Sequence, residues 1–201
     1  MLFSDTYLTI QKPSEISFKD KGSKFLAFAF PVSNEQQVKD NLLQLKKAHP
    51  SANHHCYAYR LGADKLNYRA NDDGEPSHTA GKPILGQIQS TDLTNIIIVV
   101  VRYFGGTLLG VGGLINAYKT SAAEVIKNAI IIEEQIQFKY SIQFQFEQLN
   151  DVMKLLKQLD CKINHQQFDT SCEIQFSVRK SVSEQCEEKL KKIDGLELKY
   201  S

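Results

Sequence analysis

Hydrophobic residues follow short alternating or continuous patterns in the first two thirds of the chain, and these predict a mixture of strands and helices. Residues 96–101 are all Ile or Val, which is typical of a strand buried on both faces, here taken as 95–101. An apolar stripe along 34–48, capped by Ser33 or Asn34 and stopped by Pro50, predicts an amphipathic helix. The other elements expected here are strands at 7–10, 16–18, 25–30 and 54–61, and helices at 83–88 and 117–129.

The last third of the chain has a more regular pattern. Apolar residues alternate with polar ones along 138–146, which predicts a half-buried strand. Further along, the sequence predicts helices at 150–159 and 183–193, strands at 162–168, 171–178 and 196–200, and a turn at Asp169-Thr170. The order strand–helix–strand–strand–helix–strand is typical of the ferredoxin-like fold. We therefore expect an α+β protein with two domains, 1–135 and 136–201.

Between the predicted strand 54–61 and the helix at 83–88, residues 62–81 show no periodicity and predict a long loop, a feature that is often functional. The acidic side chains of this loop can hold Mg²⁺ or Ca²⁺ through oxygen ligands, but Asp-Asp-Gly is equally an ordinary turn composition and the EF-hand spacing is absent. We expect no metal and no cofactor, and we take Thr79 as a candidate helix cap. The polar candidates of the loop are Asp72, Asp73, Glu75, Ser77, His78 and Thr79.

A glycine-dense segment follows the Ile/Val run, with five glycines between Gly105 and Gly113. Backbone N–H groups at the start of a helix bind anions, and Arg102 at the strand end can clamp a phosphate or carboxylate. The alternative is that the glycines only permit tight packing of helix on strand. The segment matches neither a Walker loop nor a dinucleotide-binding fingerprint. The candidates for binding an anion or a nucleic acid are Lys24, Lys82, Arg102, Gly105, Gly106, Thr107, Gly110, Gly112 and Gly113.

Two histidines and a cysteine lie together in the predicted strand 54–61. Strand alternation places His54 and Cys56 on one face and His55 on the other. One His/Cys pair does not make a zinc site, and a cysteine in the middle of a strand is typically a small core residue. The candidate catalytic residues are His54, His55, Asp73 and Glu75, which would have to converge with Arg102 in space.

Composition narrows the function classes. Lys and Arg total 24 against 23 Asp and Glu, which excludes a strongly basic nucleic-acid binder, so any nucleic-acid contact has to be local. The four cysteines form no CxxC pair, which argues against a disulfide framework or a zinc ribbon. No apolar run is long enough to cross a bilayer and the chain starts without a signal-peptide pattern, so we expect a cytoplasmic protein with no membrane partner.

The three polar stretches together resemble the YigZ/IMPACT family. The resemblance rests on the motifs 21–25, 54–58, 72–77, 79–85, 101–107, 109–114 and 117–118. It implies an N-terminal domain similar to the second domain of small-subunit ribosomal protein S-five, and a C-terminal domain similar to the ferredoxin-like fifth domain of elongation factor G. The eukaryotic members act in translational control. One departure is His78, which stands where the family usually has glycine.

Three functions remain open from the sequence. The first, which we favour, is a non-enzymatic regulator that binds RNA, the ribosome or a translation component, through Arg102 and the glycine segment. The second is a hydrolase-type enzyme for a phosphorylated or peptide-like small molecule, with His54, His55, Asp72, Asp73, Glu75 and Arg102 in one cleft. The third is a protein-interaction adaptor. If the six residues named for the enzyme converge in space, the enzyme is favoured over the regulator and the adaptor.

Overall fold

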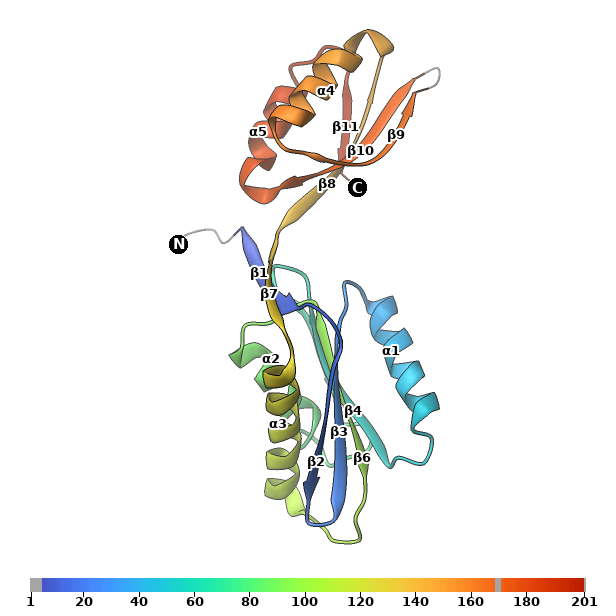
Figure 1. The fold of residues 1–201 in the computed structure, drawn as a ribbon, viewed down its shortest axis with the longest axis vertical. Helices are drawn as coiled ribbons and strands as arrows, with labels where there is room; N and C mark the ends of the chain where they lie inside the picture. Colours follow the sequence, from blue (N-terminus) through green and yellow to red (C-terminus); the bar gives the residue numbers. More distant parts are fainter. Residues whose placement is uncertain (1–4, 169–170, 201) are drawn as a thin grey trace. The chain divides into compact units, whose positions relative to one another are not determined.

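The computed structural model describes residues 5–168 and 171–200 and shows a mixed α/β protein (Figure 1). The chain divides into two compact units, one spanning Tyr7–Glu134 and the other formed by the residues from Gln135 onward together with Asp5 and Thr6. None of the described helices is both long enough and apolar enough to cross a membrane. The predicted turn at Asp169-Thr170 lies outside the described residues.

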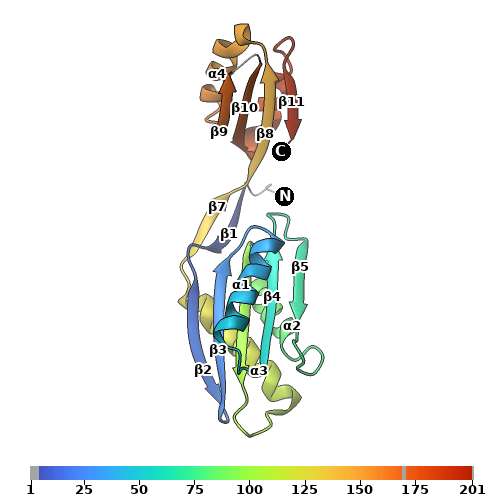
Figure 2. The same ribbon diagram turned by 90° about the vertical axis from the view of Figure 1, so that its right-hand side faces the viewer.

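The unit Tyr7–Glu134 is built on a five-stranded antiparallel sheet with helices on both faces (Figures 1 and 2). α1 (Glu35–Ala48) covers one face, and α2 (Gly81–Ser90) and α3 (Gly110–Asn128) cover the other. Two further strands, β1 (Thr6–Ile10) and β7 (Ile131–Gln135), pair with each other. In spatial order the sheet consists of β2 (Ser14–Asp20), β3 (Ser23–Pro31), β6 (Ile96–Tyr103), β4 (His54–Leu61) and β5 (Asn67–Asn71).

The central strand β6 confirms the prediction of a strand buried on both faces. Ile98 and Val100 pack into the core beneath α2 and α3, while Val99 and Val101 pack into the core beneath α1. Successive side chains of a strand point to opposite faces of the sheet, and helices cover both faces here. All four side chains are therefore completely buried. Arg102 continues the alternation and points to the α2/α3 side, where it contacts Glu75 and Phe25 and becomes part of the site described below.

The other unit contains a four-stranded antiparallel sheet with both helices on one face (Figure 1). Its core is formed by alternating residues of the sheet, including Tyr140, Ile142, Ile174 and Phe176, and by the apolar sides of the helices. The predicted succession of elements is confirmed: β8 (Gln137–Phe144), a 3-10 turn (Phe146–Gln148), α4 (Leu149–Gln158), β9 (Lys162–Phe168), β10 (Cys172–Arg179), α5 (Lys180–Leu190) and β11 (Glu197–Tyr200). The spatial order of the strands is β11-β8-β10-β9.

Two predictions for the first unit were wrong and one strand was missed, and each has a local cause. The loop 62–81 contains β5, an edge strand whose polar residues are mostly exposed, so that no apolar alternation marks it. α3 starts at Gly110 rather than Ala117, because its first turn is rich in glycine, which has a low helix propensity. β7 was not predicted because four of its five side chains are exposed.

Candidate functional site

The acidic loop reverses direction in a tight turn from Asp72 to Glu75. The Glu75 N–H donates to the Asp72 carbonyl at 2.9 Å, and the two central residues, Asp73 and Gly74, have φ of 42° and 89°. Positive φ at both central positions defines a type I′ turn, for which Asp-Gly is a preferred pair. The turn directs the side chain of Glu75 into the interior, and Glu75 is only 8% exposed.

Asp72 holds the start of α2 in place. Its carboxylate accepts hydrogen bonds from the N–H groups of His78, Ala80 and Gly81 at 2.8–3.0 Å. Burial alone would raise the pKa of this carboxyl, but the three backbone donors outweigh it and hold the pKa below its usual value. The candidate cap Thr79 was wrong: its hydroxyl donates to the Pro76 carbonyl instead, and the N-cap position is Ala80.

Replacing Asp72 by asparagine is expected to lower the free energy of unfolding by about 1–2 kcal/mol at neutral pH, as for the loss of a helix cap. Because the folded-state pKa is lowered, the carboxylate stabilises the fold fully above its unfolded-state pKa of about 3.9. That stabilisation is lost as the pH falls through the folded-state pKa. Urea titrations of both proteins over a pH series should show the difference shrinking in acid, and a pH-independent difference would contradict this role.

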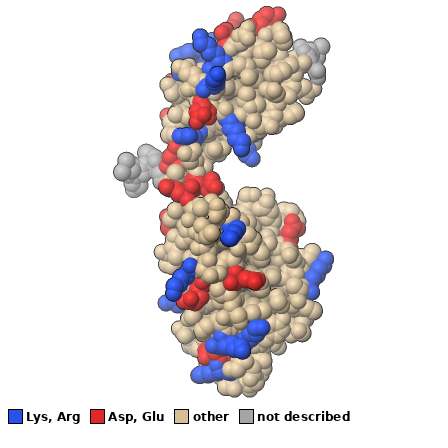
Figure 3. All heavy atoms as spheres, viewed as in Figure 1, with Lys and Arg blue, Asp and Glu red and all other residues tan. Residues whose placement is uncertain are grey.

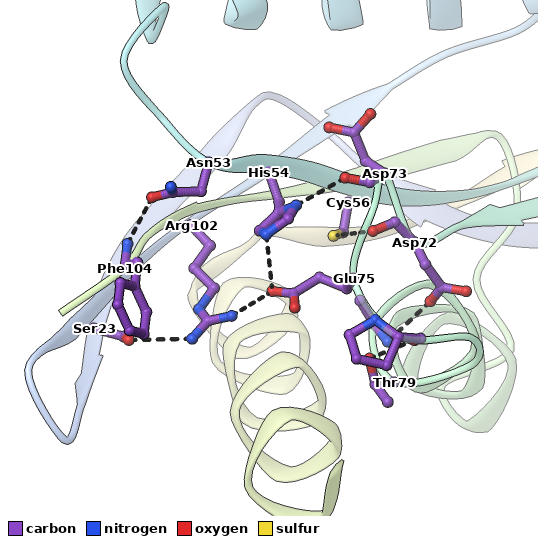
Figure 4. Close-up of polar contacts among 12 residues, drawn as sticks. Ser23, Asn53, His54, Cys56, Asp72, Asp73, Glu75, Thr79, Arg102 and Phe104 are labelled. Atoms are coloured by element: carbon purple, nitrogen blue, oxygen red, sulfur yellow. Dashed lines mark hydrogen bonds and ion pairs between the residues drawn. The ribbon is translucent and has the colours of Figure 1, made fainter. Parts of the chain in front are cut away.

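Glu75 is the centre of a buried polar cluster (Figure 4). Its Oε1 accepts hydrogen bonds from Arg102 Nη1 at 2.6 Å and from the Tyr118 hydroxyl at 2.7 Å. The Nε2 of His54 lies 3.9 Å from the same oxygen. On the other side of the imidazole, Nδ1 is 2.8 Å from the Asp73 carbonyl, which only accepts, so Nδ1 carries a proton. In the neutral ring Nε2 is therefore the free acceptor nitrogen.

Arg102 is fixed by its surroundings rather than free at the surface. The residue is 5% exposed, and its Nη2 donates to Ser23 Oγ at 3.3 Å. The guanidinium carbon lies 5.5 Å from the Phe25 ring centroid and 5.7 Å from that of Phe104. Within the described residues its buried Nε has no hydrogen-bond partner. With Glu75 as its counterion, Arg102 forms a pair with no net charge.

Cys56 belongs to the same face of β4 as His54 but serves the core. Its thiol, fully buried, is within hydrogen-bond distance of the Asp72 carbonyl (2.9 Å) and the Tyr118 hydroxyl (3.3 Å). Burial raises the pKa of the Cys56 thiol far above its usual value, and it raises the pKa of Tyr118 in the same way. A thiol held neutral is not a nucleophile at physiological pH.

His55 points to the opposite face of the sheet, as strand alternation predicts. Its backbone N–H donates to Asp73 Oδ2 at 2.7 Å, and Asp73 also pairs with Lys46 of α1 at 3.5 Å. Burial lowers the pKa of His55 more than the nearby Asp73 raises it. The structure thus brings His54, Glu75 and Arg102 together and leaves the side chains of His55 and Asp73 on the α1 side.

The glycines after β6 have different roles. A Cβ on Gly105 would stand 1.9 Å from the Gly22 carbonyl carbon and 2.2 Å from the Ser23 nitrogen, so the two backbones require glycine there. Gly106 and Gly110 have φ of 84° and 72°, in the left-handed region. Gly112, in the first turn of α3, faces open space. Tight packing therefore explains Gly105 but not Gly112.

A pocket of about 390 Å³ opens beside the cluster. Its polar residues are Asn53, His54, Glu75 and Arg102, and the start of α3 closes one side, with no side-chain cap and no acidic residue in the first turn. Its apolar wall is formed by Pro76, Phe104, Leu108, Leu109, Val111 and Leu114. The size lies in the range of small-ligand sites.

Residues 21–126 match the family model described as the Impact N-terminal domain. IMPACT family member YigZ of Escherichia coli is 34% identical over 161 residues, which cover 79% of each chain. The chain belongs to the IMPACT family. IMPACT family member YvyE of Bacillus subtilis is 38% identical over 131 residues, or 65% of this chain and 60% of that relative. A solved structure described as a hypothetical protein matches with a TM-score of 0.77, at 29% identity, covering 98% of this chain and 97% of the other.

All residues of the pocket lie inside the matched IMPACT domain. The sequence did not single out Asn53, Leu108, Val111 or Tyr118 as site residues. Phe104, Leu108 and Val111 lie among the glycines and are 46%, 84% and 60% exposed, whereas Leu109 and Leu114 of the same segment are buried. The sequence carries no signal that separates the two groups. Asn53 accepts a hydrogen bond from the Phe104 N–H at 2.8 Å and so orients that residue.

His78 has a backbone conformation that favours glycine. Its φ is 67°, in the left-handed region that glycine adopts without steric cost. The residue is exposed, and its N–H donates to Asp72. The side chain is not among those lining the pocket.

The remaining sequence candidates lie outside the pocket. Lys24 is exposed on β3. In the strand register it lies opposite Tyr103 of β6, whose side chain packs on the α1 side of the sheet. Lys82 is exposed on the first turn of α2, and Ser77 and Thr107 are exposed in loops. Basic and acidic side chains are interspersed over the face seen in Figure 3. Across the described ranges, no three His, Cys, Asp or Glu side chains form a group able to hold a metal ion.

Proposed function

We propose that this IMPACT family member is a non-enzymatic protein of the cytoplasm that binds RNA of the translation machinery. The role in translation comes from the family resemblance. The strand order β11-β8-β10-β9 and the two helices on one face support a ferredoxin-like C-terminal domain resembling the fifth domain of elongation factor G. The sheet of the first unit, with helices on both faces, supports a domain of the ribosomal protein S-five type, and we propose the boundary near residue 135.

The observation that carries the proposal is the pocket at the start of α3. The first N–H groups of a helix have no partners within the helix and favour negative charge, and here no side chain caps them. Nucleic-acid phosphates bind such termini, and unpaired RNA bases stack on aromatic side chains such as the exposed Phe104. Since basic and acidic residues are balanced, we expect contacts to only one or two phosphates.

Val111 offers a test of this site that leaves the fold intact. Val111→Asp places a carboxylate in the first turn of α3, where it favours the helix but repels a phosphate, and Val111→Asn is its uncharged match. Binding of a short single-stranded RNA should weaken roughly tenfold in Val111→Asp and change little in Val111→Asn. For the wild type, log K should fall with log salt at a slope of about −0.7 per phosphate contacted. Absence of binding at low salt, or a slope of zero, would overturn the proposal and favour a protein partner.

A second candidate function is a hydrolase-type enzyme using the same pocket. The observation in its favour is that His54, Glu75 and Arg102 do converge, with His54 Nε2 placed as a base at the pocket. Two assays distinguish the functions. RNA converted during long incubation would overturn the non-enzymatic proposal, and hydrolysis of a phosphorylated or peptide-like small molecule that His54→Ala abolishes would support the enzyme.

A further inference from the structure

The polar floor of the pocket, formed by Glu75 and His54, presents hydrogen-bond acceptors. The terminal nitrogens of Arg102 donate to Glu75 and Ser23, and the protonated Nδ1 of His54 donates to Asp73. Both hydrogen bonds that Glu75 receives from side chains go to Oε1, which leaves Oε2. His54 Nε2 is an unprotonated acceptor in the neutral ring. Glu75 and His54 therefore favour a ligand that brings N–H or O–H groups, while the amide of Asn53 still offers N–H donors at the same pocket.

The second feature is an exposed apolar surface next to the floor, formed by Phe104, Leu108 and Val111. The Arg102 guanidinium lies over the Phe104 ring, and the ring is nevertheless half exposed. The exposed Leu108 and Val111 line the same pocket. Planar heteroaromatic groups stack on such rings, and base stacking on aromatic side chains contributes strongly to binding of single-stranded nucleic acids.

The third feature is the start of α3, with Gly110 and Val111 at the pocket. This end of the pocket favours an anion, whereas the floor favours hydrogen-bond donors. A nucleotide combines the three chemistries in one molecule: donors on the base edge, a planar ring and a phosphate. A volume of about 390 Å³ suits one small ligand rather than a stretch of duplex.

We infer that the pocket holds a single nucleotide whose base carries an amino group, which rests on the proposed RNA function. The amino group donates to the Glu75 and His54 acceptors, the base stacks on Phe104, and the phosphate lies at the first turn of α3. Carboxylates accept from base amino groups in this way. Uracil has an oxygen at the corresponding position and offers only its ring N3–H as a donor, so it satisfies fewer of these acceptors and is disfavoured.

The test uses matched ligands and the full-length protein. Titration calorimetry compares CMP with UMP, and AMP with IMP, since each pair exchanges one exocyclic amino group for oxygen. We expect roughly tenfold tighter binding of CMP and AMP, and a loss of affinity for cytidine and adenosine, which lack the phosphate. Phe104→Ala should weaken binding of CMP and AMP, and Tyr68→Ala, which truncates another half-exposed aromatic residue outside the pocket, should not. Equal affinities within each pair, or an unaffected Phe104→Ala, would overturn the inference.

Competition with RNA separates this inference from the function beneath it. RNA binding that CMP and AMP displace supports both. RNA binding with the expected salt dependence, but without displacement by mononucleotides, overturns the nucleotide pocket and leaves the RNA function standing. Mononucleotide binding without RNA binding supports the pocket as a site for free nucleotides and overturns the RNA function.

Discussion

Arg102→Met is expected to lower the free energy of unfolding of the unit Tyr7–Glu134 by about 3–5 kcal/mol. Methionine approximates the length of the arginine stem and still packs between Phe25 and Phe104, so little volume is lost. The cost comes from Glu75, whose buried carboxylate loses its counterion. Among the described side chains it keeps the Tyr118 hydroxyl as a hydrogen-bond donor, with His54 Nε2 3.9 Å away. Hydrogen exchange of the β6 amides measures the change, because it reports on this unit alone.

The matched control is the double variant Glu75→Leu/Arg102→Met. Replacing both members of a buried ion pair by apolar residues is often neutral, whereas removing one is not. The double variant should therefore recover most of the lost stability. About 1 kcal/mol should remain lost, because the Tyr118 hydroxyl no longer has its acceptor. A cost below about 1 kcal/mol for Arg102→Met alone would mean that Glu75 is hydrated rather than buried.

Gly105→Ala is expected to cost more than about 3 kcal/mol, at or above the upper range for overpacking. The added methyl group would overlap the backbone of Gly22 and Ser23, which cannot move aside as a side chain does. Displacing Ser23 also removes the acceptor for the Gly105 N–H and for Arg102 Nη2. The same β6 exchange measurement, together with the yield of folded protein, checks this result.

Gly112→Ala is the companion to that variant. Apart from its chain neighbours and the backbone of its own helix, no described atom lies within 4 Å of the added Cβ. The residue is helical, so alanine should raise the stability by about 0.5–1 kcal/mol. Opposite signs for the two glycines would confirm that one is required by close backbone approach and the other is not. Equal losses at both positions would contradict it.

Much of the fold follows from local pattern. The Ile/Val run of β6 and the Asn34 side chain that accepts from the Gln37 N–H at the start of α1 formed as predicted. The strand predicted at 138–146 formed as β8 but ends at Phe144, and Phe146 is exposed in a 3-10 turn. What escaped prediction depends on tertiary contacts. β5 forms because its backbone pairs with β4, not because of its side chains, and the glycine-rich start of α3 is helical only in the context of the sheet it packs on.

The sequence predicted several residues of the candidate site but not how their side chains are arranged in space. Sequence treats Asp72, Asp73 and Glu75 as equivalent carboxylates of one loop. The type I′ turn gives each a different neighbourhood: Asp72 faces the start of α2, Asp73 faces Lys46, and Glu75 enters the core. The pairing of Glu75 with Arg102 and Tyr118 joins positions distant along the chain, which no local pattern encodes.

The shared oxygen of Glu75 has a consequence for genetics. It ties the loop after β5 to β6 through Arg102 and to α3 through Tyr118, so alleles at these three positions lower the amount of folded protein in the cell before they alter recognition. Such alleles would have the phenotype of a gene deletion, whichever molecule the protein binds. Substitutions at the exposed Phe104 and Val111 touch the same pocket without entering that junction. Separation-of-function alleles should therefore map to the rim of the pocket and not to its floor.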